Sequence, residues 1–135
     1  MRHYNIFISH SWAYGHNYDN LIKKLNADPR FNFKDYSVPK NDPIHNAPNS
    51  AQLTKAIQDQ MRWCDVIIIL AGVYSTYSTW INKEIALAKG FTNPKPILAI
   101  EPWASEKTSL VVKKSADKIV KWNTNSIIDG IRELS

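Results

Sequence analysis

Cysteine is almost absent from this chain of 135 residues, in which Cys64 is the only one. A lone cysteine cannot form an internal disulfide, and this favours a cytoplasmic protein. Because Cys64 lies between a predicted helix and an apolar strand, we interpret it as a packed thiol and not as a nucleophile. Long apolar runs are also missing: residues 66–73 form the longest, whereas a membrane-spanning helix needs about 20 residues. The N-terminus lacks the apolar stretch and cleavage site of a signal peptide, so we expect no membrane association.

Several familiar motifs are missing too. Neither the G-x-G-x-x-G motif of dinucleotide-binding folds nor the P-loop motif for phosphate binding occurs in the chain. The four histidines and the single cysteine have no spacing typical of metal ligands, so we expect no bound metal and no cofactor. Basic residues outnumber acidic ones by 17 to 12. They are scattered along the chain, however, which argues against nucleic acid as a partner.

What the chain does contain is an alternation of strand and helix patterns. Strand patterns occur at residues 4–9, 31–36, 65–73, 96–100 and 118–122. Helical periodicity separates the first four of these strands, and a closing helix is predicted to be capped by Thr124 or Asn125. This order predicts one α/β domain, residues 1–135, with a flavodoxin-like three-layer sandwich fold. Its five-stranded, mostly parallel sheet has the order 2-1-3-4-5, with helices on both faces.

In that topology a ligand crevice opens beyond the carboxyl ends of the first and third strands. The candidate substrate-binding residues are those that the first three strands and the segments after them bring to this crevice. They are Phe7, Ser9, His10, Ser11, Trp12, Tyr36, Tyr74 and Trp80. Structural roles are open for the same residues, because serines and histidines also cap turns and aromatic residues also pack in cores.

The helix predicted at residues 78–91 contains one residue that does not fit its apolar face. When residues are placed 100° apart, Glu84 lies within a continuous apolar arc. A buried carboxylate needs a partner, such as a structural ion pair, or a chemical task. Trp80 precedes Glu84 by one helical turn and lies on the same side. An indole beside a carboxylate suits an aromatic base linked to a sugar, because the ring can stack while the carboxylate meets ribose hydroxyls.

A single carboxylate limits the bonds that such a site can break. Ordinary glycosidases need two carboxylates, since the departing alkoxide must be protonated. Nicotinamide leaves NAD as a neutral molecule and needs no acid, so one carboxylate that stabilises the charge developing on the ribose can suffice.

Three segments together resemble a TIR (Toll/interleukin receptor-type) domain: YNIFISHSW, DVIIILAGVY and STWINKEIALA. The nearest resemblance is to the bacterial branch that includes the ThsB proteins of Thoeris antiphage defence. Its most specific element is W-x-x-x-E, matched by Trp80 and Glu84. The resemblance implies that Glu84 is the catalytic residue of an enzyme that cleaves NAD, its substrate, at the nicotinamide–ribose bond. It also implies self-association on activation and a diffusible product, ADP-ribose or a cyclic ADP-ribose-type signal, that activates a separate effector.

The resemblance leaves other functions open. Many animal TIR domains are adaptors, so the alternative is a non-catalytic interaction module that acts by oligomerisation. Nucleoside deoxyribosyl transfer also uses a lone carboxylate in a doubly wound fold, but the motif fits it less well. The loop predicted at residues 37–50 lacks the Arg-Asp and Pro-Gly signature of many receptor TIR domains, which argues against assembly through that loop.

Overall fold

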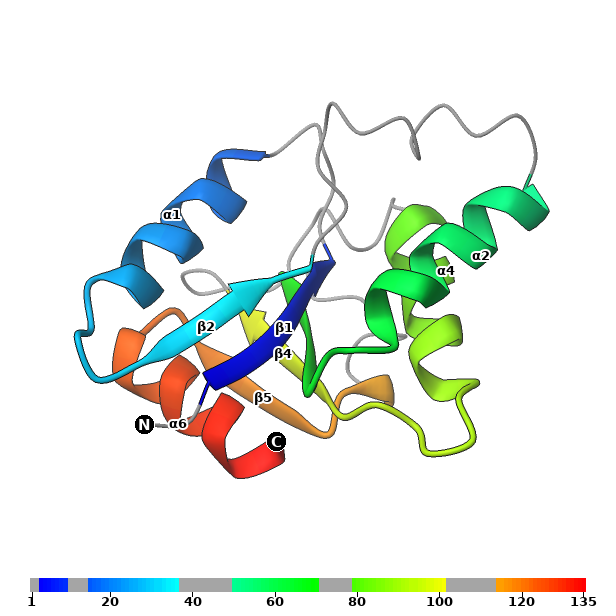
Figure 1. Cartoon of the computed structure of the whole chain (residues 1–135). Coiled ribbons are helices and arrows are strands. Elements are labelled where there is room, and N and C mark those ends of the chain that lie inside the picture. Colours follow the sequence, from blue (N-terminus) through cyan, green and yellow to red (C-terminus); the bar gives the residue numbers. More distant parts are fainter. Residues whose placement is uncertain (1–2, 10–14, 37–49, 71–78, 102–113) are drawn as a thin grey trace.

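The computed structural model of the chain describes residues 3–9, 15–36, 50–70, 79–101 and 114–135. Strands and helices alternate along these residues, as the sequence predicts (Figure 1). The strands are β1 (His3–Ser9), β2 (Asn32–Asp35), β3 (Val66–Leu70), β4 (Ile97–Glu101) and β5 (Lys118–Lys121). The helices are α1 (Gly15–Asn26), α2 (Ser50–Met61), α4 (Thr79–Lys89) and α6 (Thr124–Leu134).

The five strands form one sheet in the order β2-β1-β3-β4-β5. This is the predicted order, which is therefore confirmed. Every strand pair in the sheet is parallel. The central strands β3 and β4 are buried on both faces, which explains why their sequences are apolar without alternation, except for Glu101 at the end of β4. β2, at one edge, alternates between exposed and half-buried side chains.

Helices cover both faces of the sheet (Figure 1), with α1 and α6 on one side and α2 beside α4 on the other. Successive side chains of each strand point to opposite faces, so the core consists of two clusters. The α1/α6 cluster includes Ile6, Ile8, Ile68, Leu98 and Ile100 of the sheet with Leu21, Leu25, Ile127 and Ile131 of the helices. The α2/α4 cluster comprises Phe7, Ile57, Met61, Cys64, Ile67, Ile69, Ile85, Ala88, Ile97 and Ala99.

Two aspartates tie neighbouring strands together at the amino edge of the sheet in the same way. Asp65 precedes β3, donates its backbone N–H to the carbonyl of Asn5 at 2.7 Å and accepts the N–H of Asn5 on Oδ2 at 2.9 Å. Asp117 precedes β5 and makes the same pair of bonds with Ile97, at 2.8 and 2.7 Å. Each aspartate thus satisfies a backbone donor where the ladder of the sheet begins.

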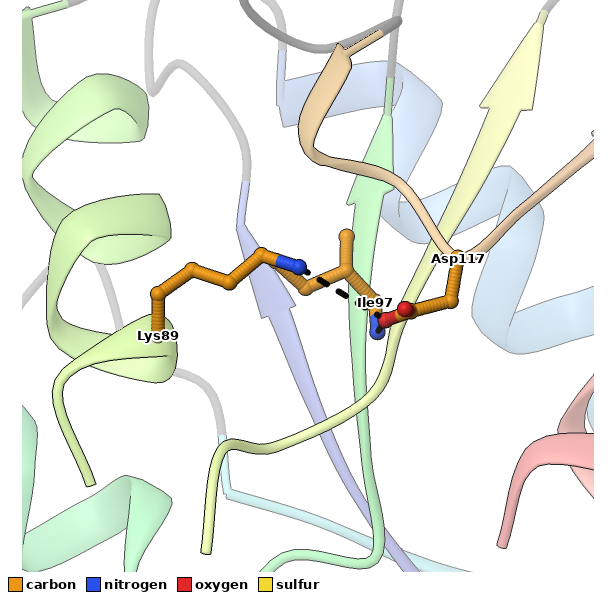
Figure 2. A network of polar contacts seen from close by, with 3 residues as sticks. All are labelled: Lys89, Ile97 and Asp117. Carbon is orange, nitrogen blue, oxygen red and sulfur yellow. Dashed lines mark hydrogen bonds and ion pairs between the residues drawn. The ribbon is translucent and has the colours of Figure 1, made fainter. Parts of the chain in front are cut away.

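The C-terminal end of α4 is attached to this amino edge. Lys89, its last residue, has Nζ 3.9 Å from Oδ2 of Asp117, which also accepts the N–H of Ile97 (Figure 2). The backbone N–H of Lys95 donates to the carbonyl of Ala88 at 3.0 Å. Because α4 connects two parallel strands, it runs antiparallel to them and begins at the carboxyl edge, where the ligand crevice is predicted.

The start of α6 corrects one prediction. Its N-cap is Asn123, and neither Thr124 nor Asn125 has that role. Asn123 has extended backbone angles, and its Oδ1 accepts the backbone N–H of Ser126 at 3.1 Å. All three residues are good caps by type, and the geometry of the chain leaving β5 decides between them.

Among the described residues, no helix is both long and apolar enough to cross a bilayer. Residues 10–14, 37–49, 71–78 and 102–113 lie outside the described residues, and with them all but the last residue of the loop predicted at residues 37–50 and the end of the strand pattern predicted at 65–73.

Candidate functional site

The strand order creates the switch point on which the predicted crevice depends. β1 and β3 are neighbours in the sheet, and Ser9 at the carboxyl end of β1 is paired in register with Ile69. From β1 the chain continues to β2 on one side, and from β3 it continues to β4 on the other. Chain segments therefore diverge at this point of the carboxyl edge, which is where doubly wound folds bind their ligands.

Glu84 lies on the buried side of α4, as the helical projection predicts. Its exposed fraction is 1%, although it is a charged residue. The next residue, Ile85, and Ala88 one turn later belong to the α2/α4 cluster, while Ala86 and Lys89 are exposed. Glu84 therefore faces the interior between α4 and its neighbours. Burying a carboxylate there is costly unless other groups interact with it or the site uses it.

Two aromatic candidates lie near the same layer of the core. Phe7 is completely buried in the α2/α4 cluster, where it packs under the helices. Tyr36 follows β2, is half-buried against the same cluster and donates its backbone N–H to the carbonyl of Ile6 at 2.8 Å. Nζ of Lys34 lies 5.0 Å from the centre of the Tyr36 ring, a cation–π contact. Phe7 thus has a core position, whereas Tyr36 has a partly open one.

The remaining candidates lie at the ends of described segments or beyond them. Ser9 is the last residue of β1 and Trp80 the second residue of α4, but their side chains lie outside the described part. His10, Ser11, Trp12 and Tyr74 lie outside the described residues altogether.

Glu101, the last residue of β4, is a buried carboxylate that was not among the residues predicted from the sequence. It is 9% exposed, and among the described residues it and Glu84 are the two buried charged residues. Its Oε1 accepts a hydrogen bond from Nζ of Lys121 on the neighbouring strand, at 2.8 Å. Ile97 and Ala99 belong to the α2/α4 cluster, so alternation along β4 directs Glu101 to the same face as α4. An acidic residue that ends a buried apolar strand was the signal available in the sequence.

Cys64 has the environment of a packed thiol, which confirms its interpretation from the sequence. It is buried in the α2/α4 cluster, and its Sγ donates to the carbonyl of Gln60 at 3.5 Å. Burial raises the pKa of the Cys64 thiol to about 12, although the nearby Lys95 ammonium lowers it in part. A thiol with this pKa is not ionised at neutral pH and is a poor nucleophile. Within the described residues, no three histidine, cysteine or acidic side chains are grouped so that they could hold a metal ion.

Solved structures of low sequence identity share this fold. A Burkholderia thailandensis protein named for pilus assembly, CpaE, is 12% identical with a TM-score of 0.57, over 99% of this chain and 98% of that one. An NADH:FMN oxidoreductase, EmoB, is 17% identical with a TM-score of 0.57, over 98% and 90% of the two chains. The CMP N-glycosidase BcmB of Clostridium botulinum is 16% identical with a TM-score of 0.54, over 96% and 98%. These likenesses show the flavodoxin-like fold alone.

A family of sequences matches most of the chain. It is described as the TIR-like domain of the Thoeris protein ThsB, and the match covers residues 7–107. Both buried carboxylates, Glu84 and Glu101, lie within the matched part. None of the curated proteins compared with this chain matches it.

Proposed function

Because this chain belongs to the family of TIR-like domains of the Thoeris protein ThsB, we propose that it is an enzyme that cleaves NAD between nicotinamide and ribose. The burial of Glu84 carries the proposal. A carboxylate that is 1% exposed occupies a helix face made for packing, one turn after Trp80 in the W-x-x-x-E motif. Ionisable side chains in such buried positions are concentrated where a charge has a chemical task.

In the proposed reaction, Glu84 acts on the ribose next to nicotinamide. Its ionised carboxylate accepts hydrogen bonds from the ribose hydroxyls and faces the positive charge that develops at C1′. The electron pair of the C1′–N bond passes to the pyridinium nitrogen, so nicotinamide departs neutral and needs no acid. A fixed negative charge in an environment with little water stabilises such a transition state much more than it would in bulk water.

The rest of the proposed site surrounds the carboxyl ends of β1 and β3. Trp80 is the second residue of the helix that bears Glu84, and in this proposal its indole stacks on the ligand. The other proposed substrate contacts come from the segments that follow the first three strands: Ser9, His10, Ser11, Trp12, Tyr36 and Tyr74. Phe7, completely buried, supports the end of β1 from within the core.

The product is ADP-ribose or a cyclic ADP-ribose-type signal, which activates a separate effector in antiphage defence. Two considerations support this part of the proposal. The Thoeris family relates the chain to a defence system. The CMP N-glycosidase, a protein of similar fold, is named for cleaving an N-glycosidic bond of a nucleotide, so the fold can support this class of reaction.

The proposal is tested by incubating the pure full-length chain with NAD and measuring nicotinamide by chromatography. Wild-type protein, assayed over a range of concentrations and with a crowding agent, is expected to release nicotinamide. Glu84→Gln keeps the shape and removes the charge, and should lose activity by about a hundredfold or more. The matched control is Glu133→Gln on α6: the Glu133 side chain is 62% exposed and should be dispensable for activity.

Thermal unfolding of the same samples separates catalysis from a structural role. If Glu84 served only a buried ion pair, Glu84→Gln would unfold more easily by about 3–5 kcal/mol while the folded fraction kept its activity. A stable and inactive variant supports the proposal. A destabilised but active variant refutes it. A wild-type protein that releases no nicotinamide in any of these conditions supports the non-catalytic interaction module instead.

A further inference from the structure

Lys95 lies in a stiff segment that is fixed to the amino edge of the sheet. It stands between Pro94 and Pro96. A proline has a fixed φ angle, and a residue that precedes a proline favours extended backbone angles. The carbonyl of Pro96 accepts the backbone N–H of Ile67 on β3 at 2.9 Å, and the next residue, Ile97, begins β4. The backbone of Lys95 is therefore placed by the sheet, whatever contacts its side chain makes.

From this position Lys95 bonds the C-terminal ends of two helices. Its backbone N–H donates to the carbonyl of Ala88, in the last turn of α4, at 3.0 Å. Its Nζ donates to the carbonyls of Arg62 and Cys64, just after α2, at 3.0 and 3.1 Å. Ammonium groups are favoured at a helix C-terminus, where carbonyls lack partners within the helix. One half-buried lysine thus connects α2, α4 and the sheet.

The Phe91 ring keeps the Lys95 side chain in this direction. Nζ lies 5.5 Å from the ring centre, a cation–π contact. Phe91 lies two residues after the end of α4 and packs against the α2/α4 cluster. With two carbonyls and one ring as partners, the Lys95 ammonium has a defined place and not the freedom of a surface lysine.

Apolar packing alone does not fix the position of α4 along α2. The two helices lie side by side on one face of the sheet (Figure 1) and share the α2/α4 cluster, to which Ile57 and Ile85 belong. The hydrophobic effect is non-directional, and helices that pack in this way shift by about 1–2 Å in many switching proteins. Hydrogen bonds are directional, so the bonds made by Lys95 select one position.

A change at the end of α4 reaches Glu84 through one turn of helix. Ala88, which Lys95 bonds, follows Glu84 by four residues, about 6 Å at ~1.5 Å per residue. A helix is stiff over this length, so a shift at Ala88 also moves Glu84. For a group that acts on a bound substrate, a misplacement of about 1 Å caused far from the chemistry can reduce the rate about a hundredfold.

On the basis of the proposed function, we infer that Lys95 is a positioning residue for Glu84. By bonding the C-terminal ends of α2 and α4, it sets the position of α4 along α2 and so places the Glu84 carboxylate against the ribose of NAD. It acts from the amino edge of the sheet, at the opposite end of both helices from the predicted crevice, and therefore through α4.

Substitution separates the side-chain bonds of Lys95 from its backbone bond. Lys95→Met keeps the aliphatic stem and the N–H bond to Ala88 but removes both bonds to the end of α2. It should lower kcat for nicotinamide release by about ten- to a hundredfold, with little change in KM, at a temperature where thermal unfolding shows it to be folded. Lys95→Arg retains a cationic donor and should recover most of this activity. The matched control is Lys118→Met, which removes the ion pair with Glu133 on α6 and should leave kcat unchanged.

A second measurement follows α4 without NAD. Spin labels are attached to Lys55→Cys on α2 and Ala86→Cys on α4, two exposed positions, and their separation is measured by electron paramagnetic resonance. The labelled chain carries Cys64→Ser, which keeps the backbone carbonyl that Lys95 bonds. Lys95→Met should shift or widen the distribution of distances between the labels, whereas Lys95→Arg and Lys118→Met should not.

The two measurements separate a positioning role from a merely stabilising one. A changed separation together with a lower kcat supports the inference. An unchanged separation, or an unchanged kcat in folded Lys95→Met, overturns it, even if the melting temperature falls. A wild-type protein that releases no nicotinamide refutes the proposed function and the effect on kcat with it, and the labels then decide alone whether Lys95 sets the position of α4. Should Lys95→Met fail to fold, Lys95→Gln, with a shorter N–H donor, replaces it with the same expected results.

Discussion

Asp117 occupies the corner where α4, β4 and β5 meet. We predict that the hydrogen bond accepted by its carboxylate oxygen stabilises this corner more than the ion pair made by its charge does. Oδ2 accepts the backbone N–H of Ile97 at 2.7 Å and lies 3.9 Å from Nζ of Lys89 (Figure 2). Substitution separates the two contacts. Asp117→Asn keeps an oxygen that can accept the hydrogen bond, Asp117→Ala removes both contacts, and Lys89→Met removes only the ion pair.

The expected magnitudes follow from burial. Ile97 is completely buried, and leaving a buried donor without its acceptor costs about 1–3 kcal/mol. The side chains of Lys89 and Asp117 are 41% and 43% exposed, and such solvated pairs contribute at most about 1 kcal/mol. Asp117→Ala should therefore lower the melting temperature by roughly 4–12 °C for a domain of this size. Lys89→Met should lower it by less than about 4 °C, and Asp117→Asn should fall between them, near the lysine variant.

Urea and thermal unfolding of the three variants measure these differences. Asp65→Ala serves as an independent repeat, because Asp65 holds the backbone N–H of Asn5 in the same manner, at 2.9 Å. If Asp117→Asn and Lys89→Met were as unstable as Asp117→Ala, the charge would be responsible and the hydrogen-bond argument would be refuted.

Two further predictions concern pH and assembly. Burial raises the pKa of the Cys64 thiol from its ordinary value of 9.0 to about 12, so the stability it contributes is complete below pH 9 and is lost as the pH rises toward 12. Between pH 8 and about pH 10.5, urea unfolding should therefore show a larger fall in the free energy of unfolding for wild type than for Cys64→Ser. Equal falls for the two proteins would contradict this. If NAD cleavage requires self-association, specific activity should rise with protein concentration. A specific activity that is the same at every concentration, from a protein that stays monomeric, would contradict this.

The site could be predicted from the sequence only where a local pattern encodes it. Glu84 was identified because helical periodicity places it among apolar residues, and its burial confirms that placement. The catalytic role of Glu84 stays a prediction, as do the roles of the residues that follow β1 and β3. Glu101 was missed because a carboxylate at the end of a strand looks like the beginning of a loop. Its burial appears only once the sheet is packed.

The sequence by itself determined the order of elements, the parallel sheet and the apolar faces of the helices. These properties depend on side-chain periods of two and about 3.6 residues, which are visible within a short segment. Only the tertiary structure decided which distant polar groups meet. Asp65 pairs with Asn5 across 60 positions, and Lys121 pairs with Glu101 across 20. The physical reason is that such contacts depend on the register between strands, and register is established when whole faces pack against each other.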